Sequence, residues 1–389
     1  MIKYENMPQI TMEEVKNGLE ICTEHILHIL PEFTDKFQTA ASENLFYKQC
    51  DNIDWTNGFW TGEIWLAYEY SKDERLKEAA LLQCKSFYER IAKKIAVSNH
   101  DMGFLYSLSC VAAYKLTGDE IAKKAALMAA DNLLGMFRTK GNFIQSYDDP
   151  ENKEEYRVIV DALLNIPLLY WASEITGEDK YKAAAIKHFH TTDKYLMRED
   201  GSTAQAALFD NQTGEFLYNF TRQGYSNDSA WSRGQAWAIY GPAISYKYTG
   251  MEACKVMFRR ATTYFMEHLP EDMVAYFDLI ITEGNEWPRD SSAAAIAVCG
   301  MLEMAKHLEP EEAGYYIICA KKIMKSLYDN YMVRNHETSN GLLQHSTYCC
   351  QTPYNLMDID AGKDECCLFG DYFYLEALTR LYQDWKMYW

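Results

Sequence analysis

The chain has 389 residues, of which 48% are hydrophobic and 24% charged, a composition that is ordinary for a globular protein and excludes a disordered one. Its formal net charge is −18 and it has no run of five or more basic residues, so we expect no nucleic-acid partner. Its first residues lack the apolar core of a signal peptide, and no apolar run approaches membrane-spanning length, so we expect no membrane partner.

Pairs of helices recur along the chain, each joined by a short turn. The first helix of a pair is apolar on nearly all sides and should be buried, whereas the second has a polar face and should lie outside. Gly118 and Gly177 can take the left-handed conformation that ends a helix, and the acidic residue after each can cap the next helix. Strand signals are confined to loops, at residues 141–145 and 275–278. Five helix pairs are predicted, over residues 59–90, 103–137, 161–195, 236–268 and 291–331.

A sixth pair is split between the two ends of the chain. Residues 371–385 form the last apolar helix, and residues 11–30 form an amphipathic helix that begins with a capping box of Thr11 and Glu14. If these helices pack together, six inner and six outer helices close into an all-α (α/α)6 barrel. An open solenoid is the alternative, but the long, unequal loops and the lack of a regular repeat length favour the ring. We therefore expect a single (α/α)6-barrel catalytic domain over residues 1–389.

Side chains that can do chemistry collect at one end of the predicted ring. The inner helices run parallel, so their N-terminal ends share one mouth, whereas their other ends are short turns. One side of the ring should therefore be functional and the other structural. The segments before the inner helices are rich in Asp, His, Arg and Trp, and they cover residues 54–60, 99–103, 156–161, 227–235, 286–292 and 370–372.

Two aspartates in these segments are candidates for acid–base catalysis. Asp161 lies in an apolar run, and burial there would raise its pKa toward the range that a general acid needs near neutral pH. It could instead cap a helix or pair with Arg157, four residues earlier. Asp101 is equally consistent with a cap for the helix at Gly103. Paired acids at the mouth of an α-toroid are typical of enzymes that act on sugars.

The cysteine content indicates the cell compartment, and the aromatic content indicates the class of ligand. Eleven cysteines without a secretion signal are typical of reduced thiols in the cytoplasm. Two adjacent pairs, Cys349-Cys350 and Cys366-Cys367, lie near His345 but lack the two-residue spacing that wraps a tetrahedral zinc, so no metal or other cofactor is expected. Aromatic residues make up 14% of the chain, which favours a carbohydrate ligand, although packing in a large core explains any single one equally well.

Several motifs point to one family. Residues 223–237 read Gln-Gly-Tyr-Ser-x-Asp-Ser-Ala-Trp-x-Arg-Gly-Gln-Ala-Trp, which is the most specific of them. Residues 55–60, 100–104, 288–293 and 370–377 add weaker matches. On these segments the chain resembles the unsaturated glucuronyl hydrolases, glycoside hydrolase family 88, over nearly its whole length. The resemblance implies an (α/α)6 barrel that releases a 4,5-unsaturated uronic acid from the non-reducing end of lyase-generated, glycosaminoglycan-type di- and oligosaccharides.

The resemblance also implies a mechanism, in which the C4=C5 vinyl ether is hydrated and the unstable hemiketal then opens. Asp161 matches the general acid/base, which protonates C4 and deprotonates the water that attacks C5. Asp101 matches the second acid, which holds ring hydroxyls and helps to stabilise the cationic transition state. Gln223, Arg233 and Trp237 match positions that contact substrate, and Arg233 is the candidate partner of the uronate carboxylate.

Further site residues follow from the same resemblance. Trp55, Phe59 and Tyr147 would form stacking walls and His100 a polar contact, although barrel packing explains the aromatics about as well. Gln205 stands where many members carry a His thought to assist the catalytic acid, and glutamine can hydrogen-bond but cannot titrate. The loop over residues 346–363 does not show the serine/lysine segment with which members grip a sulfate, so a preference for sulfated substrates is not implied.

Two other functions remain open at this point. An unsaturated rhamnogalacturonyl hydrolase would have the same fold and chemistry with rhamnose at the leaving position, but the motif at residues 231–237 favours the glucuronyl enzymes. A non-catalytic helical sugar-binding scaffold would explain the repeats but not the one-sided cluster of Asp, His, Arg and Trp. The sequence does not indicate an oligomeric state.

Overall fold

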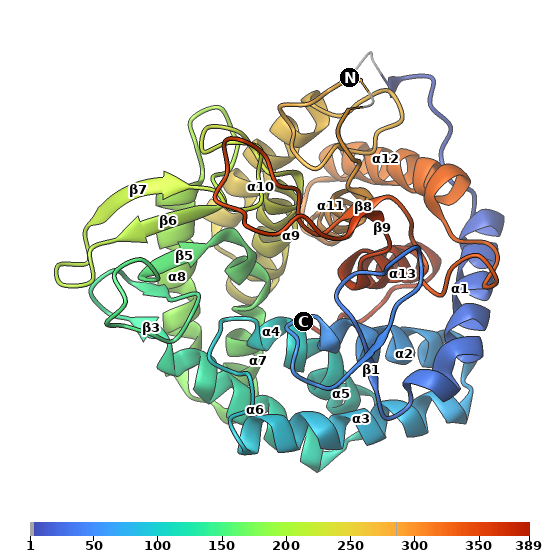
Figure 1. The fold of residues 1–389 in the computed structure, drawn as a ribbon, viewed down its shortest axis with the longest axis horizontal. Coiled ribbons are helices and arrows are strands. Elements are labelled where there is room, and N and C mark those ends of the chain that lie inside the picture. The colour runs from blue at the N-terminus through green and yellow to red at the C-terminus, as the bar shows by residue number, and fades with distance from the viewer. Residues whose placement is uncertain (1–3, 285) are drawn as a thin grey trace.

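The computed structural model describes residues 4–284 and 286–389, which form a closed ring of helices in two layers (Figure 1). The inner layer consists of α2 (Asn57–Ser71), α4 (Met102–Tyr106) with η2 (Ser107–Val111) and α5 (Ala112–Thr117), η3 (Val160–Leu164) with α7 (Pro167–Thr176), α9 (Ser232–Thr249), α11 (Ser291–Ala305) and α13 (Leu368–Tyr382). The outer layer consists of α1 (Met12–Phe33), α3 (Glu74–Ala92), α6 (Glu120–Gly135), α8 (Asp179–Leu196), α10 (Glu252–Glu267) and α12 (Pro310–Ser326), which η4 (Leu327–Tyr331) extends. Within the described residues, none of the helices has the length and apolar character needed to cross a bilayer.

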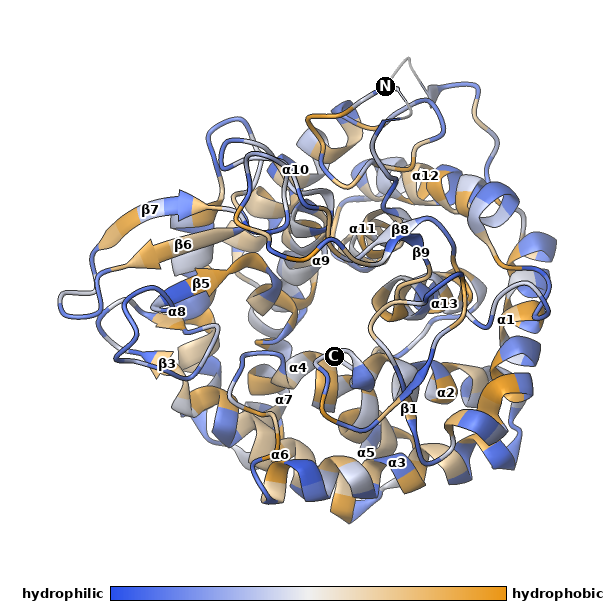
Figure 2. Ribbon diagram, in the orientation of Figure 1, coloured by the Kyte–Doolittle hydropathy of each residue, from blue (hydrophilic) through white to orange (hydrophobic). Residues whose placement is uncertain are grey.

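The two layers differ in polarity as the sequence predicts. Every residue of α11 is buried, whereas α1 and α10 each bury one face and present polar residues on the other (Figure 2). The predicted turns are also present, because Gly118 and Gly177 end their helices with φ of 75° and 74°. Asp119 caps the following helix by accepting the Ala122 N–H at 2.7 Å.

The ring closes through the two ends of the chain. Helix α13 packs against both α1 and α2, so the predicted pairing of the first and last helices is confirmed, and the structure is the expected (α/α)6 barrel. The capping box of α1 is present, since the Glu14 N–H donates to Thr11 Oγ1 at 3.2 Å and the Thr11 N–H donates to Glu14 Oε2 at 2.9 Å. Helix α13 ends at Tyr382 rather than at residue 385, because the backbone of Gln383 is extended.

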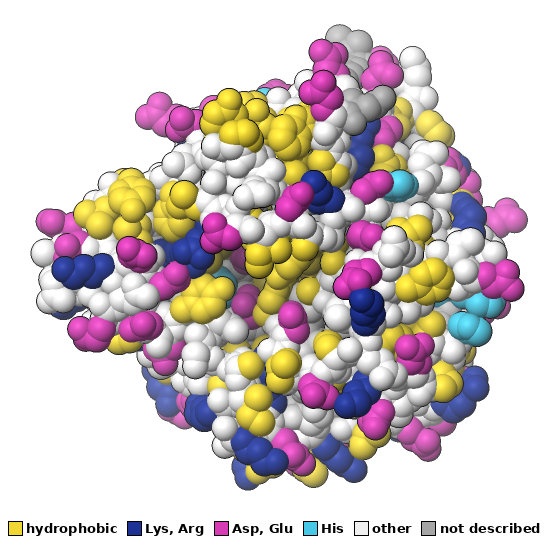
Figure 3. Space-filling view, viewed as in Figure 1, with side chains coloured by type: hydrophobic (Ala, Val, Ile, Leu, Met, Phe, Trp, Pro, Cys, Tyr) yellow, Lys and Arg dark blue, Asp and Glu magenta, His cyan; other side chains and the backbone are white. Residues whose placement is uncertain are grey.

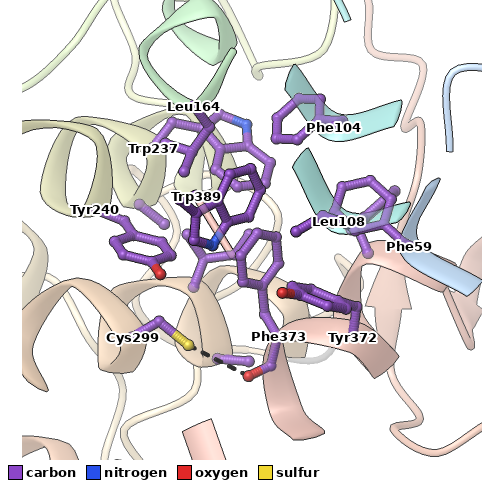
Figure 4. Close-up of a cluster of buried hydrophobic side chains, with 14 of the residues drawn as sticks. Phe59, Phe104, Leu108, Leu164, Trp237, Tyr240, Cys299, Tyr372, Phe373 and Trp389 are labelled. Carbon is purple, nitrogen blue, oxygen red and sulfur yellow. Dashed lines mark hydrogen bonds between the residues drawn. The ribbon is translucent and has the colours of Figure 1, made fainter. Parts of the chain in front are cut away.

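The residues after α13 return to the inside of the ring and complete its core (Figure 4). Trp389 is fully buried and stacks on Phe373, with 5.9 Å between ring centroids and 1° between planes. Phe104 contacts Trp389 at 6.2 Å and Trp237 at 5.3 Å between centroids. Lys115 Nζ donates to the Trp389 carbonyl at 3.2 Å. We call Phe104, Trp237, Phe373 and Trp389 the central aromatic cluster.

A three-stranded antiparallel sheet, which was not predicted from the sequence, stands beside the mouth of the ring. It contains β5 (Arg157–Ile159), β6 (Ala206–Phe209) and β7 (Phe216–Phe220) in that order. Asp210 and Gly214 between two hydrophobic runs are turn residues that could have signalled the β6–β7 hairpin. The sheet matters for function because the Val160 N–H donates to the Gln205 carbonyl at 3.0 Å, which fixes the backbone beside Asp161.

The remaining strands are short and lie in loops. Of the two predicted loop strands, the first contains β4, whereas the second forms only isolated bridges, from Tyr276 to Arg289 and from Asp278 to Trp231. The short strands pair as β1 (Phe37–Gln38) with β2 (Gln49–Cys50), β3 (Phe137–Arg138) with β4 (Phe143–Ile144), and β8 (Ser346–Thr347) with β9 (Lys363–Glu365).

The central aromatic cluster predicts a stability effect. Trp389→Ala should lower the free energy of unfolding by about 3 to 5 kcal/mol, because it removes a fully buried indole from a close-packed centre. It also removes the hydrogen bond from Trp389 Nε1 to Glu376 Oε2, 3.0 Å long. Trp389→Phe keeps a ring in the stack and should cost less. Urea unfolding followed by circular dichroism measures both, and a Trp389→Ala loss below about 1 kcal/mol would contradict the role assigned to this residue.

Candidate active site

A pocket opens where the N-terminal ends of the inner helices meet, on the face where hydrophobic side chains gather around a central hollow (Figure 3). Four of the six predicted segments, residues 54–60, 99–103, 156–161 and 227–235, therefore contribute side chains to this mouth, whereas no residue of 286–292 or 370–372 lines the pocket. Their chemical roles remain predictions. Nine of the ten predicted site residues line the pocket, namely Trp55, His100, Asp101, Tyr147, Asp161, Gln205, Gln223, Arg233 and Trp237.

Phe59 is the exception, and its predicted role as a stacking wall is corrected by the structure. Its side chain is fully buried and lies among the rings of Phe104, Tyr372 and Phe373, at centroid distances of 5.2, 5.6 and 5.7 Å (Figure 4). It also packs edge-on behind Trp55 at 6.1 Å. Phe59 therefore supports the pocket wall from the core. It follows Trp55, which lines the pocket, by four residues and lies behind it.

Asp161 lies in η3, the first turn after β5, and its carboxyl group faces the pocket. Burial raises the pKa of this carboxyl to about 6, and its own backbone N–H, Arg233 and Arg157 offset part of that rise. The structural alternatives do not apply, since Ile159 is the N-cap of η3 and Arg157 pairs with Glu155 at 2.8 Å. A carboxyl with this pKa can both hold and release a proton near neutral pH.

Asp101 lies beside Asp161 at the start of α4, where it is the N-cap residue but makes no capping hydrogen bond. Burial, followed by the charge of Asp161, raises the pKa of Asp101 well above its ordinary range. His100 Nε2 lies 3.5 Å from Asp101 Oδ1, and burial lowers the pKa of His100 to about 3, so this imidazole is neutral. Asn165, which was not predicted as a site residue, joins the two acidic segments. Its Nδ2 donates to the Asp161 carbonyl at 3.3 Å, and its Oδ1 accepts the Phe104 N–H at 3.0 Å.

Several buried polar atoms in the pocket wall lack a hydrogen-bond partner within the described residues. They are His100 Nδ1, Arg157 Nε and Nη1, Asp161 Oδ1 and Trp237 Nε1. A buried polar atom without a partner costs about 1–3 kcal/mol, more if it is charged. Their concentration in one pocket indicates a ligand that offers both hydrogen-bond donors and acceptors.

Arg233 is held firmly in the wall of the pocket. Its Nη1 donates to Asp290 Oδ2 at 2.9 Å and to the Thr347 carbonyl at 2.6 Å, and its Nη2 donates to the Tyr348 carbonyl at 2.8 Å. The guanidinium also lies between the rings of Trp231 and Phe369, 4.5 and 4.3 Å from their centroids. Much of its hydrogen-bonding capacity is therefore structural, and the Asp290 carboxylate already offsets its charge.

Gln205 organises the loop that carries Arg222 and Gln223. Its Oε1 accepts three hydrogen bonds, from Thr221 Oγ1 at 2.8 Å, from the Arg222 N–H at 2.6 Å and from the Gln223 N–H at 2.9 Å. Its Nε2 donates to Gln223 Oε1 at 2.7 Å. This network gives the amide a structural task for which no proton transfer is needed.

Two arginines in the pocket were not predicted as site residues. Arg157 is buried beneath Tyr147, with its guanidinium 5.5 Å from the ring centroid. Arg222 is exposed at the mouth and pairs with Glu155 Oε1 at 3.3 Å. Their positions in the sequence carried a signal, because Arg157 lies four residues before Asp161 and Arg222 immediately precedes the most specific motif.

Across residues 4–284 and 286–389, no three His, Cys, Asp or Glu side chains gather into a set that could coordinate a metal ion. Cys349 lines the pocket, and burial raises the pKa of its thiol to about 11, so it is protonated at neutral pH.

Comparison with known proteins agrees with this geometry. The model of Glycosyl Hydrolase Family 88 matches residues 28–358. The unsaturated chondroitin disaccharide hydrolase of Streptococcus agalactiae serotype III (strain NEM316) is 42% identical over 100% of this chain and 96% of its own. A crystal structure of unsaturated glucuronyl hydrolase from Streptococcus agalactiae has a TM-score of 0.94 at 42% identity, covering 100% of this chain and 96% of that one. A variant of that enzyme complexed with dGlcA-GalNAc6S has a TM-score of 0.87 at 40% identity, with the same coverage.

Fold and site together define an (α/α)6 glycoside hydrolase with two carboxyl groups at its mouth. The chain belongs to glycosyl hydrolase family 88. The resemblance inferred from residues 223–237 is therefore confirmed, and the chain is an enzyme rather than a non-catalytic sugar-binding scaffold.

The Gln205 network predicts a positioning effect on catalysis. Gln205→Met keeps the length of the side chain but removes the acceptor for three donors, so the Arg222–Gln223 loop should shift. A displacement of this kind can cost about 100-fold in kcat/KM. Gln205→Glu retains an acceptor oxygen and should lose less. Steady-state kinetics on the unsaturated disaccharide that the family resemblance implies measure both variants, and the pH profile of Gln205→Met should keep the shape of the unmodified enzyme's profile. A changed profile in Gln205→Met would contradict a purely positioning role.

Proposed function

We propose that Asp161 and Asp101 carry out the family's reaction in this pocket, which releases a 4,5-unsaturated uronic acid from the non-reducing end of lyase-generated di- and oligosaccharides. The observation that carries the proposal is the pair of buried carboxyl groups beside two arginines, in a wall with unpaired donors and acceptors. Relatives named for unsaturated chondroitin disaccharide support a glycosaminoglycan-type substrate rather than a rhamnogalacturonyl one.

The reaction is a hydration that leaves the anomeric carbon untouched at first. Asp161 protonates C4, and the positive charge that develops at C5 is shared with the ring oxygen. Water then adds to C5 and returns a proton to Asp161, so the carboxyl group is restored. The C5 hemiketal opens to a ketone, and the hemiacetal left at C1 collapses to an aldehyde and releases the saturated sugar. General acid/base catalysis of this kind typically contributes about 10²–10⁴-fold.

The two acids have different tasks in this scheme. Burial and the charge of Asp161 raise the pKa of Asp101, which favours its protonated form, so it can donate a hydrogen bond to a ring hydroxyl. The bound uronate brings a negative charge close to Asp161, because its carboxylate is attached to the reacting carbon C5. That charge raises the pKa of Asp161 further and favours the acid form that protonates C4.

The uronate carboxylate requires cationic partners, because the chain as a whole carries −18. Arg157 offers two buried N–H donors, Nε and Nη1, that have no partner in the described part of the chain. Arg233 lines the same pocket. It can use the N–H donors that do not already bond to Asp290 or to the backbone carbonyls of residues 347 and 348. We assign the carboxylate to the space between these two guanidinium groups.

The cell compartment belongs to the same proposal. All eleven cysteines are free thiols, and ten of them are buried. A reducing compartment preserves such thiols, so we place the enzyme in the cytoplasm, where it would act on short oligosaccharides that have been imported.

Asp161→Asn tests the mechanism. The variant keeps the shape of the side chain but cannot donate or accept the proton, so turnover should fall by about two to four orders of magnitude while the fold is retained. Loss of the alkene's ultraviolet absorbance measures turnover, and in heavy water the product should carry one deuterium at C4. Asp179→Asn, at an exposed aspartate at the start of the outer helix α8, is the control and should keep its activity. An unlabelled C4, or substantial activity in Asp161→Asn, would rule out hydration by this group.

The pKa of Asp161 predicts the pH dependence. Its protonated form starts the reaction, so kcat/KM should fall as the pH rises through about 6. Arg157 lowers this pKa, so Arg157→Met should raise it and move the descending limb to higher pH. Arg75→Met, on the exposed face of α3, is the matched control and should leave the limb in place. A limb that stays fixed or moves to lower pH in Arg157→Met would show that Asp161 is not the titrating group.

A further inference from the structure

We propose that Arg90, near the end of the outer helix α3, is a positioning residue for the reaction (Figure 1). Its guanidinium group clamps the two loops that lead to Trp55 and Asp101, and its charge acts on Asp101 from behind the pocket. Arg90 is not one of the residues that line the pocket, so it acts through these two side chains. The inference rests on the proposed function, since it concerns how one of the two acids is held.

The side chain of Arg90 is buried and uses every hydrogen-bond donor that a guanidinium group has. Its Nε donates one hydrogen bond, and its Nη1 and Nη2 donate two each, over distances of 2.9 to 3.3 Å. The acceptors are Asn52 Oδ1 and the backbone carbonyls of Ile53, Asp54, Ile95 and Ala96. One rigid, planar group therefore sets the distance between two loops that are far apart in the chain.

Both loops run directly into the candidate active site. The first is followed at once by Trp55, which lines the pocket. The second reaches Asp101 through residues 97–100, and backbone hydrogen bonds of 2.9 Å tie this stretch to the segment at residues 146–148. The stretch is therefore held at both ends and along its length. A displacement at residues 95–96 is passed on to Asp101, because no slack loop lies between them to absorb it.

The second loop has a strained backbone that Arg90 holds in place. Lys94 and Ala96 have φ of 55° and 48°, in the left-handed region that residues with a Cβ atom disfavour. The Arg90 carbonyl accepts the Ile95 N–H at 2.9 Å, and its guanidinium group binds the carbonyls of Ile95 and Ala96. Strained conformations persist only where such contacts over-determine them. We therefore expect this loop to relax when the guanidinium group is lost.

The charge of Arg90 also reaches Asp101, because all five acceptors of its hydrogen bonds are neutral oxygen atoms. Burial and the charges of Asp161 and Asp54 raise the pKa of Asp101. The charge of Arg90 lowers this pKa, as does a hydrogen bond with Asn165, and the imidazole beside Asp101 is neutral. A carboxyl group with a lower pKa is a stronger hydrogen-bond donor. Arg90 therefore strengthens the bond that Asp101 donates to the substrate in the proposed mechanism.

Arg90→Lys tests the clamp, because an ammonium group keeps the charge but cannot reach five acceptors arranged around a planar fork. On an unsaturated uronyl disaccharide of N-acetylgalactosamine, kcat per folded enzyme should fall about 10- to 100-fold, and by a larger factor than KM rises. Arg259→Lys, on the outer helix α10 and paired with Glu312 at 2.7 Å, is the matched control and should keep both constants. A purely structural role would reduce the amount of folded enzyme and leave its kcat unchanged, and that result would overturn the clamp.

Asn52→Asp tests the charge while the clamp stays in place. A carboxylate oxygen can accept the 2.9 Å bond that Asn52 Oδ1 accepts, and the Ser86 hydroxyl, 3.1 Å from Asn52 Nδ2, can donate in return. The new negative charge neutralises that of Arg90, so the pKa of Asp101 should rise. The fall of kcat/KM that accompanies ionisation of Asp101 should then move to higher pH, and by more than the fall near pH 6 moves. Asn335→Asp, at an exposed position, is the matched control and should leave the whole profile in place.

The two variants separate the possible outcomes. If the fall assigned to Asp101 stays in place or moves to lower pH in Asn52→Asp, the action of the charge is overturned. If Arg90→Lys does not fold, the pH profile of Asn52→Asp decides the inference alone. An active unmodified enzyme whose two variants behave like their controls would overturn the inference and leave the proposed function intact. An unmodified enzyme that turns over no unsaturated uronyl disaccharide would overturn both.

Discussion

Two glycines set how closely the inner helices that carry the acids approach one another. A Cβ atom at Gly103 would lie 2.4 Å from the Asn165 Cα, and one at Gly58 would lie 2.1 Å from the Phe104 carbonyl oxygen. Both distances are far below van der Waals contact, so only glycine permits these backbones to touch. The contact between Gly103 and Asn165 joins the helix start at Asp101 to the turn after Asp161, and the rest of the pocket is built around that junction.

Close approach of the backbones also removes water from beneath the acids. The central aromatic cluster seals the floor, with Phe104 packed between Trp55 and Trp237. A carboxyl group above such a floor loses hydration, which is the largest cause of the raised pKa of both Asp101 and Asp161. The packing of the core therefore determines, through burial, how far the pKa values of the two carboxyl groups are raised. The buried arginines limit the shift of Asp161, so that its pKa stays near 6.

The sequence predicted those parts of the structure that depend on local pattern. The helix pairs, the left-handed turns at Gly118 and Gly177 and the capping box at Thr11 each follow from the chemistry of a few neighbouring residues. The direction in which a side chain points from a fully buried helix does not follow from such local patterns. Residues 57–67 of α2 are buried on all sides, so periodicity could not show that Phe59 points into the core while Trp55, just before the helix, faces the pocket. The place of residues 356–359 at the pocket was not predicted for a related reason, since it depends on hydrogen bonds from Thr352 and Asn355 to residues more than a hundred positions away.

Gln205 limits where protons can reside in this pocket. Its amide cannot titrate, and its oxygen is already bonded to three donors. His100 is neutral because burial lowers its pKa to about 3, whereas Asp161, with a pKa of about 6, can exchange a proton near neutral pH. Two neighbouring carboxyl groups share protons as a pair, and a bound uronate adds a third negative charge beside them. Substrate binding and proton uptake are therefore coupled in the proposed mechanism, because the anion binds best to the form of the enzyme that already holds the proton it will receive at C4.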